Sequence, residues 1–326
     1  MKKRVFSGVR PTGRLHLGNY VGAIKNYVTL QGEYDCVYAI VDLHALTTLE
    51  ETSKLKENVR EVVLDFLAAG LDPARSTIFV QSHVPEVTEL FTILGMLTPL
   101  SWLLRVPTFK EKVRMHPQNV NYGLVGYPVL MASDILTYKA EVVPVGEDQL
   151  PHLELTREIV RRFNEHFGPT FAEPQAKLTS YPMVVGLDGR DKMSKSLNNH
   201  IELAATADET MKKVMSAVTD PARKLRSDPG HPEVCNVYKL QGYFNSLRAA
   251  GITEECREAK IGCVECKRLL AEAVNTELAP LRARRTELAA HPQDIDNILR
   301  EGAENARAIA RTTLLEVKQK TGLMAL

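Results

Sequence analysis

The chain has 326 residues, of which 44% are hydrophobic and 25% charged, a balance typical of soluble globular proteins large enough for two domains. Its apolar runs are too short to span a membrane, and the basic start Met-Lys-Lys-Arg-Val lacks the apolar core of a signal peptide. We therefore expect a cytoplasmic protein with no membrane partner. A formal net charge of +1 excludes a global attraction to nucleic acid, so any polyanion must bind at local basic patches.

The first half of the chain alternates short apolar runs with amphipathic patterns of helical spacing. The run at 4–9 is apolar and leads into a Pro-Thr-Gly turn, and a helix is expected to begin near Leu17. The run at 36–42 is apolar throughout, as in a strand buried on both faces of a parallel sheet. Further strands are expected at 76–82 and 141–146, and further helices over 55–67, from Pro85 onwards, and from 153 to an end near Gly168.

Strands and helices that alternate in this way predict an α/β fold with a Rossmann-like, doubly wound parallel sheet. Ligands bind such sheets at the carboxyl ends of the strands, where Asp42, His44, Gly146 and Asp148 fall. After about residue 200 only helical periodicity remains, so we predict a catalytic domain at 1–200 and an α-helical domain at 201–326. The expected helices of the second domain cover 211–218, 269–288 and 295–317, the last ending at Gly322, and 221–230 is the most loop-like segment.

Two polar segments, far apart in the sequence, carry the candidate chemistry. His16-Leu17-Gly18-Asn19 lies at the start of a predicted helix, where backbone N–H groups are unpaired and attract anions. Lys-Met-Ser-Lys-Ser at 192–196 follows an Asp-Gly turn and predicts a mobile cationic loop that can close over a polyphosphate. An ordinary solvated surface loop is the alternative for this second segment. The chain contains neither a P-loop nor a G-x-G-x-x-G motif after a strand, so ATP, if it binds, binds in another way.

The two segments, in this order and on either side of a Rossmann-like region, resemble the paired signatures of class I aminoacyl-tRNA synthetases. The stretches 127–136 and 143–157 resemble the tryptophanyl branch of that family. This resemblance covers nearly the whole chain. It implies that ATP with Mg²⁺ activates L-tryptophan to its adenylate, that tryptophan passes to the 3′ end of tRNA(Trp), that residues 201–326 bind the anticodon, and that the enzyme is a homodimer.

Adenylate formation involves no covalent enzyme intermediate, so the enzyme must position its reactants and stabilise the charge that develops on pyrophosphate. Lysines and hydroxyl groups do this, and the resemblance implies catalytic roles for Lys192, Ser194 and Lys195. Lys112 is a further candidate, with an ordinary surface lysine as its alternative. The implied ATP-binding residues are Arg10, Pro11, Thr12, His16, Gly18, Asn19, Gly146, Glu147, Asp148, Gln149, Met183, Val184, Lys192, Met193, Ser194, Lys195 and Ser196.

Some members of this set have a second interpretation or depart from the family pattern. Gly18 permits a close approach that a Cβ atom would block. Asp148 is also a candidate cap for the helix that follows it, a role that can coexist with ligand binding. Asn19 stands where many class I enzymes have histidine, as the tryptophanyl branch tolerates. Arg10 stands where other members have glutamine, and it either adds positive charge to the site or turns away to pair with an acidic neighbour.

Specificity for tryptophan requires one acceptor for the indole N–H in an otherwise apolar slot. The resemblance assigns this role to Asp134, and a hydrogen bond to such a charged acceptor contributes about 1.5–3 kcal/mol. Tyrosine would need both a donor and an acceptor, and Phe6 stands where the tyrosyl branch is expected to offer a hydroxyl group. For Met131 and Tyr127, a plain core role is the alternative. The expected lining of the slot is Phe6, Gly8, His44, Tyr127, Met131, Val143 and Val145.

Four of the five cysteines crowd into one segment with the spacing C-x20-C-x6-C-x2-C. Four thiolates in a reducing compartment suit structural zinc or an iron–sulfur cluster. Zinc ribbons usually have two C-x2-C pairs and this chain has one, which favours the cluster. The arrangement resembles a subgroup of tryptophanyl enzymes that carries a structural [4Fe-4S] cluster. The expected ligands are Cys235, Cys256, Cys263 and Cys266, whereas Cys36 is expected to be a buried small apolar residue.

Two other functions remain open from the sequence. A nucleotidyltransferase that does not act on tRNA can share the first signature and the sheet, but it offers no reason for a helical C-terminal third. An inactive RNA-binding paralogue would have no need of the intact lysine loop and Asp134. Basic residues near the cysteines are candidate contacts for tRNA phosphates, although each is more often a solvated surface charge. These residues are Arg223, Lys224, Arg226, Lys260, Lys267 and Arg268.

Overall fold

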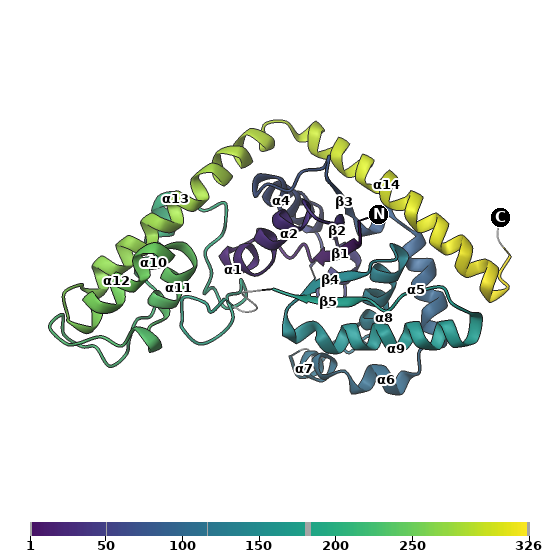
Figure 1. Ribbon diagram of the computed structural model, residues 1–326, viewed down its shortest axis with the longest axis horizontal. Helices are drawn as coiled ribbons and strands as arrows, with labels where there is room; N and C mark the ends of the chain where they lie inside the picture. The colour runs from purple at the N-terminus through teal and green to yellow at the C-terminus, as the bar shows by residue number, and fades with distance from the viewer. Residues whose placement is uncertain (1, 50, 116, 180–183, 325–326) are drawn as a thin grey trace. The chain divides into compact units, whose positions relative to one another are not determined.

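The computed structural model describes residues 2–49, 51–115, 117–179 and 184–324, except for the side chains of Thr108, Glu111, Lys112 and Met115. Contacts divide the chain into two compact units, a sheet unit and a helical unit (Figure 1). The sheet unit consists of Met1–Gly13, Asn26–Pro182 and His291–Leu326, and the helical unit consists of Arg14–Lys25 and Met183–Ala290.

The sheet unit is built on five parallel strands in the order β3-β2-β1-β4-β5 (Figure 1). The strand order runs outward from β1 in both directions, which confirms the predicted doubly wound α/β architecture and places a ligand-binding edge at the carboxyl ends of the strands. Cys36 is 1% exposed and confirms its predicted role as a core residue. The strands are β1 (Arg4–Val9), β2 (Asp35–Ile40), β3 (Ser76–Val80), β4 (Val142–Val145) and β5 (Gln175–Leu178).

The first four strands agree with the sequence prediction to within two residues at each end. The fifth strand, β5, was not predicted. Its sequence is Gln-Ala-Lys-Leu, and none of its four side chains is fully buried because it lies at the edge of the sheet. It therefore has neither the apolar run of a central strand nor the alternation of a half-buried one.

Helices in the sheet unit bury apolar faces of helical spacing, as predicted. In α4 the buried positions include Val59, Val62, Val63 and Phe66, and α8 packs against α5 and α9. These elements are α3 (Asp42–Ala45), α4 (Leu55–Ala68), α5 (Glu86–Leu97), α6 (Leu100–Arg105), α7 (Pro107–Met115), α8 (Tyr122–Thr137) and α9 (Leu150–Phe167), with the short 3₁₀ turns η2 (Gln81–His83) and η3 (Glu147–Gln149).

The last helix, α14 (Pro292–Thr321), also belongs to the sheet unit, because it packs against β3. A Cβ atom on Gly302 would lie 1.9 Å from the carbonyl oxygen of Ile78, so only glycine permits this close approach. Arg307 on α14 also pairs with Glu86 at 2.9 Å. The helix ends at Gly322, which has a φ of 76° and confirms the predicted stop.

The helical unit contains helices and no regular strand among its described residues. Its longest helix, α13, buries Leu270, Val274 and Leu278 and packs against α10 and α11. The signature helix begins as α1 (Leu17–Asn19), passes through a π turn, η1 (Tyr20–Ile24), and continues as α2 (Lys25–Leu30), whose residues from Asn26 onwards belong to the sheet unit. The other elements are α10 (Ala207–Met215), η4 (Pro232–Val234), α11 (Asn236–Phe244), α12 (Ser246–Arg257) and α13 (Cys263–Ala289).

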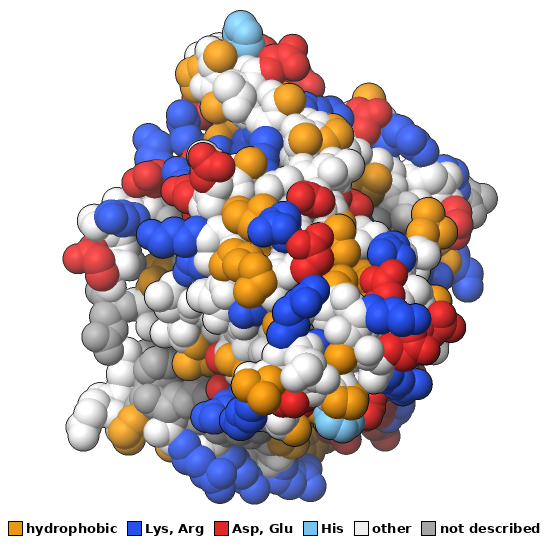
Figure 2. All heavy atoms as spheres, turned by 90° about the vertical axis from the view of Figure 1, so that its left-hand side faces the viewer, with side chains coloured by type: hydrophobic (Ala, Val, Ile, Leu, Met, Phe, Trp, Pro, Cys, Tyr) orange, Lys and Arg blue, Asp and Glu red, His pale blue; other side chains and the backbone are white. Residues whose placement is uncertain are grey.

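The contacts thus divide the chain differently from the predicted boundary after residue 200. Residues 14–25 and 183–200 join the helical unit, and residues 291–326 join the sheet unit. The catalytic and anticodon-binding roles assigned to 1–200 and 201–326 stay predictions. Over most of the face drawn in Figure 2, basic side chains are interspersed with acidic ones, as expected for a nearly neutral chain. Among the described helices, none combines the length and the apolar character that crossing a membrane requires.

Candidate active site and cysteine site

Asp134 of α8 forms a buried hydrogen-bonded group with two side chains that follow strands of the sheet. Gln81 Nε2 donates to Asp134 Oδ1 at 2.7 Å, and His44 Nε2 lies 2.8 Å from Asp134 Oδ2. Asp134 is 2% exposed, and a buried carboxylate without partners would be costly, so these neighbours hold it in place. A carboxylate offers about four lone-pair sites, so Asp134 retains acceptor capacity for a ligand N–H.

Gln81 is a residue that the sequence analysis missed, although a signal was present. It directly follows β3, at the same carboxyl edge of the sheet that drew attention to Asp42. Asp42 itself accepts from the backbone N–H of Ser82 at 3.0 Å and from its hydroxyl group at 2.5 Å. Asp42 therefore fixes the loop after β3.

The residues predicted to line the tryptophan slot share the core of the sheet unit. Phe6, Val143 and Val145 are buried in one apolar cluster, and Met131 packs against it. The Phe6 ring stacks on Tyr138, with 5.4 Å between centroids. A further member of the predicted lining, Gly8, leaves no room for a side chain, since a Cβ atom there would lie 2.7 Å from Val41 Cγ1.

The predicted lining residue Tyr127 is buried in α8. Its hydroxyl group lies 3.4 Å from His152 Nε2, at the long end of hydrogen bonding. The phenol is thus held from α9 as well as from its own helix, and both the core role and the lining role predicted for Tyr127 fit this position.

The segment after β4 forms a tight turn with exposed acids. The Gln149 N–H donates to the Gly146 carbonyl oxygen at 3.0 Å, and Asp148 Oδ2 accepts from Gln149 Nε2 at 2.9 Å. Neither η3 nor α9 receives a side-chain cap. The alternative interpretation of Asp148 as a helix cap is therefore wrong, because its carboxylate turns to the neighbouring amide, and the exposed Glu147 and Asp148 remain accessible to a ligand.

Among the described residues, Arg10 pairs with no acidic neighbour, and its expected contribution of positive charge to the site stays a prediction. Its Nη2 donates to Thr48 Oγ1 at 2.5 Å, so its recorded partner is a hydroxyl group and not an acidic residue. Burial lowers the pKa of Arg10. Pro11 beside it is buried, whereas Thr12 is exposed.

In the helical unit, the first signature lies at the start of the signature helix. His16 is 7% exposed, and its backbone N–H donates to Asn19 Oδ1 at 3.1 Å. The Leu17 N–H donates to the Ile201 carbonyl oxygen at 2.9 Å, which ties this start to the segment after the lysine loop. Gly18 and Asn19 lie in the first turn, as predicted.

Asn199 organises the lysine loop at 192–196. Its Oδ1 accepts from the Ser194 N–H at 2.7 Å, and its Nδ2 donates to Asp188 Oδ2 at 2.8 Å. Met193 is buried, and its N–H donates to the Val184 carbonyl oxygen at 2.9 Å. Asn199 was not predicted from the sequence, because an asparagine in a polar segment carries no local signal of such a role.

The two signatures meet within the helical unit. A Cβ atom on Gly18 would lie 3.0 Å from the His16 imidazole and 3.2 Å from Met193 Cβ, so the helix start and the lysine loop are in close contact. Burial, and then the positive charges of His200, Lys195 and Lys192, lower the pKa of His16 to about 3. His16 is thus held neutral beside a cationic loop.

Two predicted residues lie wholly or partly outside the described part of the chain. Met183 falls outside the described residues, as does the side chain of Lys112, although the backbone of Lys112 belongs to α7.

The family described as tRNA synthetases class I (W and Y) matches residues 1–279. The chain belongs to this family.

Relatives of this synthetase match it over its whole length. A tryptophan–tRNA ligase of Thermotoga maritima is 46% identical over 98% of this chain and 99% of its own length, and one of Aquifex aeolicus is 41% identical over 98% and 100%. A tryptophanyl-tRNA synthetase structure from Campylobacter jejuni, complexed with ADP and tryptophan, has a TM-score of 0.88 at 36% identity and covers 98% of this chain and 100% of that one.

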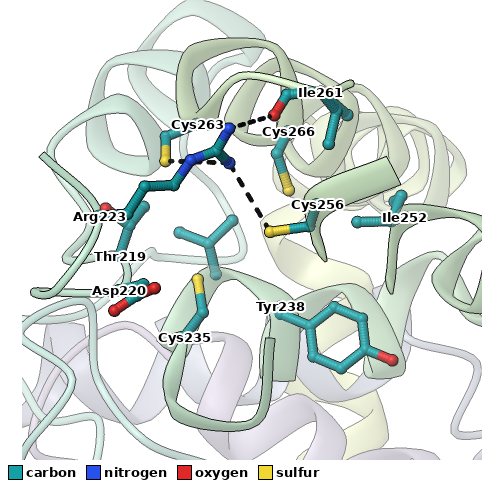
Figure 3. Close-up of a pocket in the computed structure, with 11 residues that line it drawn as sticks. Thr219, Asp220, Arg223, Cys235, Tyr238, Ile252, Cys256, Ile261, Cys263 and Cys266 are labelled. Atoms are coloured by element: carbon teal, nitrogen blue, oxygen red, sulfur yellow. Dashed lines mark hydrogen bonds between the residues drawn. The ribbon is translucent and has the colours of Figure 1, made fainter. Parts of the chain in front are cut away.

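The same synthetase carries a cysteine site in its helical unit. Cys235, Cys256, Cys263 and Cys266 line a single cavity of about 20 Å³ (Figure 3). Cys235 directly precedes α11, Cys256 lies near the end of α12, and the other two lie in the first turn of α13. Among the described residues, no three His, Cys, Asp or Glu side chains are grouped as a single metal ion requires. The four cysteines predicted as ligands therefore share one cavity. In the described part of the chain, their sulfurs are not close enough together to bind one metal ion as the structure stands.

Arg223 enters this cavity among the sulfurs (Figure 3). Its Nη1 lies 3.7 Å from Cys256 Sγ and 4.0 Å from Cys263 Sγ, and its Nη2 donates to the carbonyl oxygen of Ile261 at 2.9 Å. The predicted tRNA contact at Arg223 is thus corrected, because the guanidinium group is engaged with the cysteine site. Lys267 is engaged as well, donating to the Met215 carbonyl oxygen at 2.9 Å.

Other neighbours shape the environment of the sulfurs. Gln241 Nε2 donates to Cys266 Sγ at 3.6 Å, and a Cβ atom on Gly230 would lie only 2.4 Å from Cys256 Sγ. Burial raises the pKa of the Cys266 thiol to about 11 and also raises that of Cys256. These thiols are therefore protonated near neutral pH unless a cation draws off their protons.

Proposed function

We propose that this synthetase activates L-tryptophan with ATP, forming tryptophanyl-adenylate and pyrophosphate, and then transfers tryptophan to the 3′ end of tRNA(Trp). Full-length similarity to tryptophan–tRNA ligases supports this function. The observation that carries the activation step is the contact between Gly18 and Met193, which joins the two signatures around a buried neutral His16.

In the helical unit, the signatures are proposed to bind the phosphates of ATP, which enters as its Mg²⁺ complex. Lys192 and Lys195 supply positive charge for the leaving pyrophosphate, and the hydroxyl groups of Ser194 and Ser196 supply further donors. Gly18 gives the phosphates access to the backbone at the helix start. Because His16 is neutral, it donates a hydrogen bond without adding a charge that the lysines would repel.

The remaining ATP contacts are proposed from the resemblance. Hydroxyl and amide groups of Thr12 and Asn19 suit phosphate or ribose oxygens, and the exposed carboxylates that follow β4 suit ribose hydroxyl groups. Buried Met193 and Val184 offer apolar surface to adenine. The other proposed contacts are Arg10, Pro11, Gly146, Glu147, Asp148, Gln149 and Met183, with Lys112 as a further catalytic lysine.

In the sheet unit, Asp134 is proposed to accept the indole N–H of tryptophan. Its carboxylate is already oriented by Gln81 and His44, so the acceptor needs no rearrangement when the substrate enters. The substrate ring then requires apolar walls, which Phe6, Val143 and their neighbours provide. A phenol would leave its hydroxyl group unsatisfied against these walls, which favours tryptophan over tyrosine.

An amino-acid panel in the pyrophosphate–ATP exchange assay tests this function. Exchange should depend on tryptophan and should be absent with the other amino acids, and the purified enzyme should charge tRNA(Trp). Exchange with tyrosine alone would place the enzyme in the sister branch. Exchange without charging of any tRNA would favour a nucleotidyltransferase.

The partners follow from the reaction and from exposed surfaces. We place the enzyme in the cytoplasm, where charged tRNA is used. The exposed basic residues Lys224, Arg226, Lys260 and Arg268 are proposed to contact tRNA phosphates. A homodimer is proposed for the sheet unit, where Met96, Leu100 and Leu104 at α5 and α6 are exposed apolar side chains that association would cover.

The four cysteines of the helical unit are proposed to hold a [4Fe-4S] cluster, with zinc as the alternative. The donor set fits a cluster, because each thiolate binds its own iron and the sulfurs need not close around one ion. When bound, the cluster would supply four iron–thiolate bonds that cross-link the segments around α11, α12 and α13. Arg223 and Gln241 would donate hydrogen bonds to the sulfurs and offset their negative charge.

Metal analysis of anaerobically purified enzyme tests this assignment. Iron and labile sulfide are expected at about four each per chain, with a brown colour. The variant Arg223→Gln should lose iron faster than wild type on exposure to a chelator, whereas exposed Lys224→Gln serves as a matched control. Colourless protein with one zinc per chain would overturn the cluster.

A further inference from the structure

One carboxylate on α13 receives two side chains of the signature helix. Glu277 Oε1 accepts from the Tyr20 hydroxyl group at 3.1 Å and lies 2.8 Å from Lys25 Nζ. The Lys25 ammonium group also lies over the Tyr20 ring, 5.1 Å from its centroid. The Lys25 and Glu277 side chains are only 37% and 29% exposed, so the network is partly shielded from water. None of these three residues belongs to a signature.

The π turn makes this convergence possible. In a regular α-helix, residues five apart point about 140° away from each other around the axis. In η1 the Lys25 N–H instead bonds to the Tyr20 carbonyl oxygen, which places residue 25 above residue 20. A helix with regular hydrogen bonds would turn one of the two side chains away from Glu277. The π turn therefore allows Tyr20 and Lys25 to contact Glu277 at the same time.

This arrangement lies one turn from the proposed phosphate site. The Tyr20 N–H donates to the His16 carbonyl oxygen at 3.0 Å. Gly18, between them, has no spare room against Met193. A rotation of the signature helix about its axis would therefore press Gly18 into the lysine loop or draw it away. Fixing Tyr20 and Lys25 from α13 prevents that rotation.

A second residue of α13 holds the other side of the same site. Arg282 Nε donates to the Leu203 carbonyl oxygen at 3.3 Å, and its Nη2 donates to Thr210 Oγ1 at 2.7 Å. The Leu203 N–H in turn donates to the Leu15 carbonyl oxygen at 2.9 Å. The helix α13 thus braces both chain segments that flank the contact between the signatures.

We propose that Glu277 is a positioning residue for ATP, acting through Tyr20 and Lys25 to set the rotation of the signature helix. The proposal rests on the proposed binding of ATP phosphates at this helix. Glu277 contributes no contact to ATP itself. Its effect should appear as weaker ATP binding, with tryptophan binding unchanged.

The test measures ATP affinity by calorimetry in the full-length enzyme, without tryptophan, for Glu277→Gln, Tyr20→Phe and the double variant. Loss of the ionic contact should weaken ATP binding about five- to tenfold, and loss of the hydroxyl group by a smaller factor. The double variant should bind ATP more weakly than either single variant, because the amide oxygen left by Glu277→Gln can still accept from the Tyr20 hydroxyl group and Tyr20→Phe removes that contact as well. Exposed Glu272→Gln on the same helix is the matched control and should bind ATP as wild type does.

Several outcomes separate positioning from a merely structural role. Recovery of most ATP affinity in Glu277→Asp, which keeps the charge, would support positioning. ATP affinity in Glu277→Gln equal to that of Glu272→Gln would overturn it. If Glu277→Gln fails to fold, Tyr20→Phe alone still decides, since unchanged ATP affinity there contradicts the proposal. Wild-type enzyme that binds ATP but shows no tryptophan-dependent exchange would instead count against the proposed function.

Discussion

The proposed tryptophan site of the sheet unit and the proposed phosphate site of the helical unit differ in how their polar and charged groups are held. Asp134 is a buried carboxyl group with a neutral amide donor on one side and His44 on the other. His16 is a buried base kept neutral among cations. The hydrogen bonds that orient Asp134 are already formed in the absence of a ligand. The proposed phosphate site gathers the positive charges of Lys192 and Lys195 near a buried neutral imidazole, so we expect it to be the more sensitive to mutation.

The largest effect is predicted for Lys195→Ala, which removes positive charge from the phosphate site. The rate constant kcat of tryptophan-dependent pyrophosphate exchange should fall about 100- to 1,000-fold, because transition-state charge is left without its donor. The KM for tryptophan should equal that of wild type. Lys56→Ala, at an exposed position of α4, is the control. An exchange rate within threefold of wild type would remove Lys195 from the reaction.

A smaller effect is predicted for Asp134→Asn in the tryptophan site. The change keeps the shape of the side chain and removes its charge, so the KM for tryptophan should rise about 10- to 100-fold, as expected for loss of a charged hydrogen-bond acceptor. The KM for ATP should change little. Equal changes in both KM values would mean that Asp134 acts on the fold and not on the indole.

Asn199→Ala tests whether the lysine loop depends on its internal hydrogen bonds. The variant frees the Ser194 N–H and Asp188, so the KM for ATP should rise about tenfold. Asn198→Gly is a matched control, because the φ of 49° at Asn198 suits glycine. An equal KM for ATP in Asn199→Ala and Asn198→Gly would contradict this role of Asn199.

The smallest effect concerns the pH dependence of stability. The pKa of His16 is lowered to about 3 in the folded protein, whereas an unfolded chain titrates near 6.5. Between these values the unfolded chain binds more protons, so the free energy of unfolding falls as pH is lowered from 6.5 towards 3. The slope from this group is at most about 1.4 kcal/mol per pH unit. In His16→Asn, the denaturant midpoint of unfolding should depend less on pH between pH 6.5 and 5.5 than it does in wild type. An equal dependence on pH in the two proteins would show that His16 protonates freely in the folded state.

The sequence by itself predicted the strands β1 to β4, and it contains the two signatures and the spaced cysteines that point to the candidate sites. These features are local, because an apolar run, a helix start or a pair of close cysteines is readable within a few residues. It also singled out Gly18 as permitting a close approach of ATP, which stays a prediction, and the structure adds a packing reason for glycine there, because a Cβ atom would lie 3.2 Å from Met193 Cβ. Edge strand β5 was not predicted, because its exposed sequence has no apolar pattern.

Tertiary structure alone decided which distant residues serve these features. Gln81 orients Asp134, Asn199 holds the lysine loop, Arg223 enters the cysteine cavity and Glu277 fixes the signature helix. Each is a polar residue whose partner is set by packing of elements, and not by spacing along the chain. The same reason explains why α14 joins the sheet unit, since its place depends on a surface of β3 that forms only when the sheet has folded.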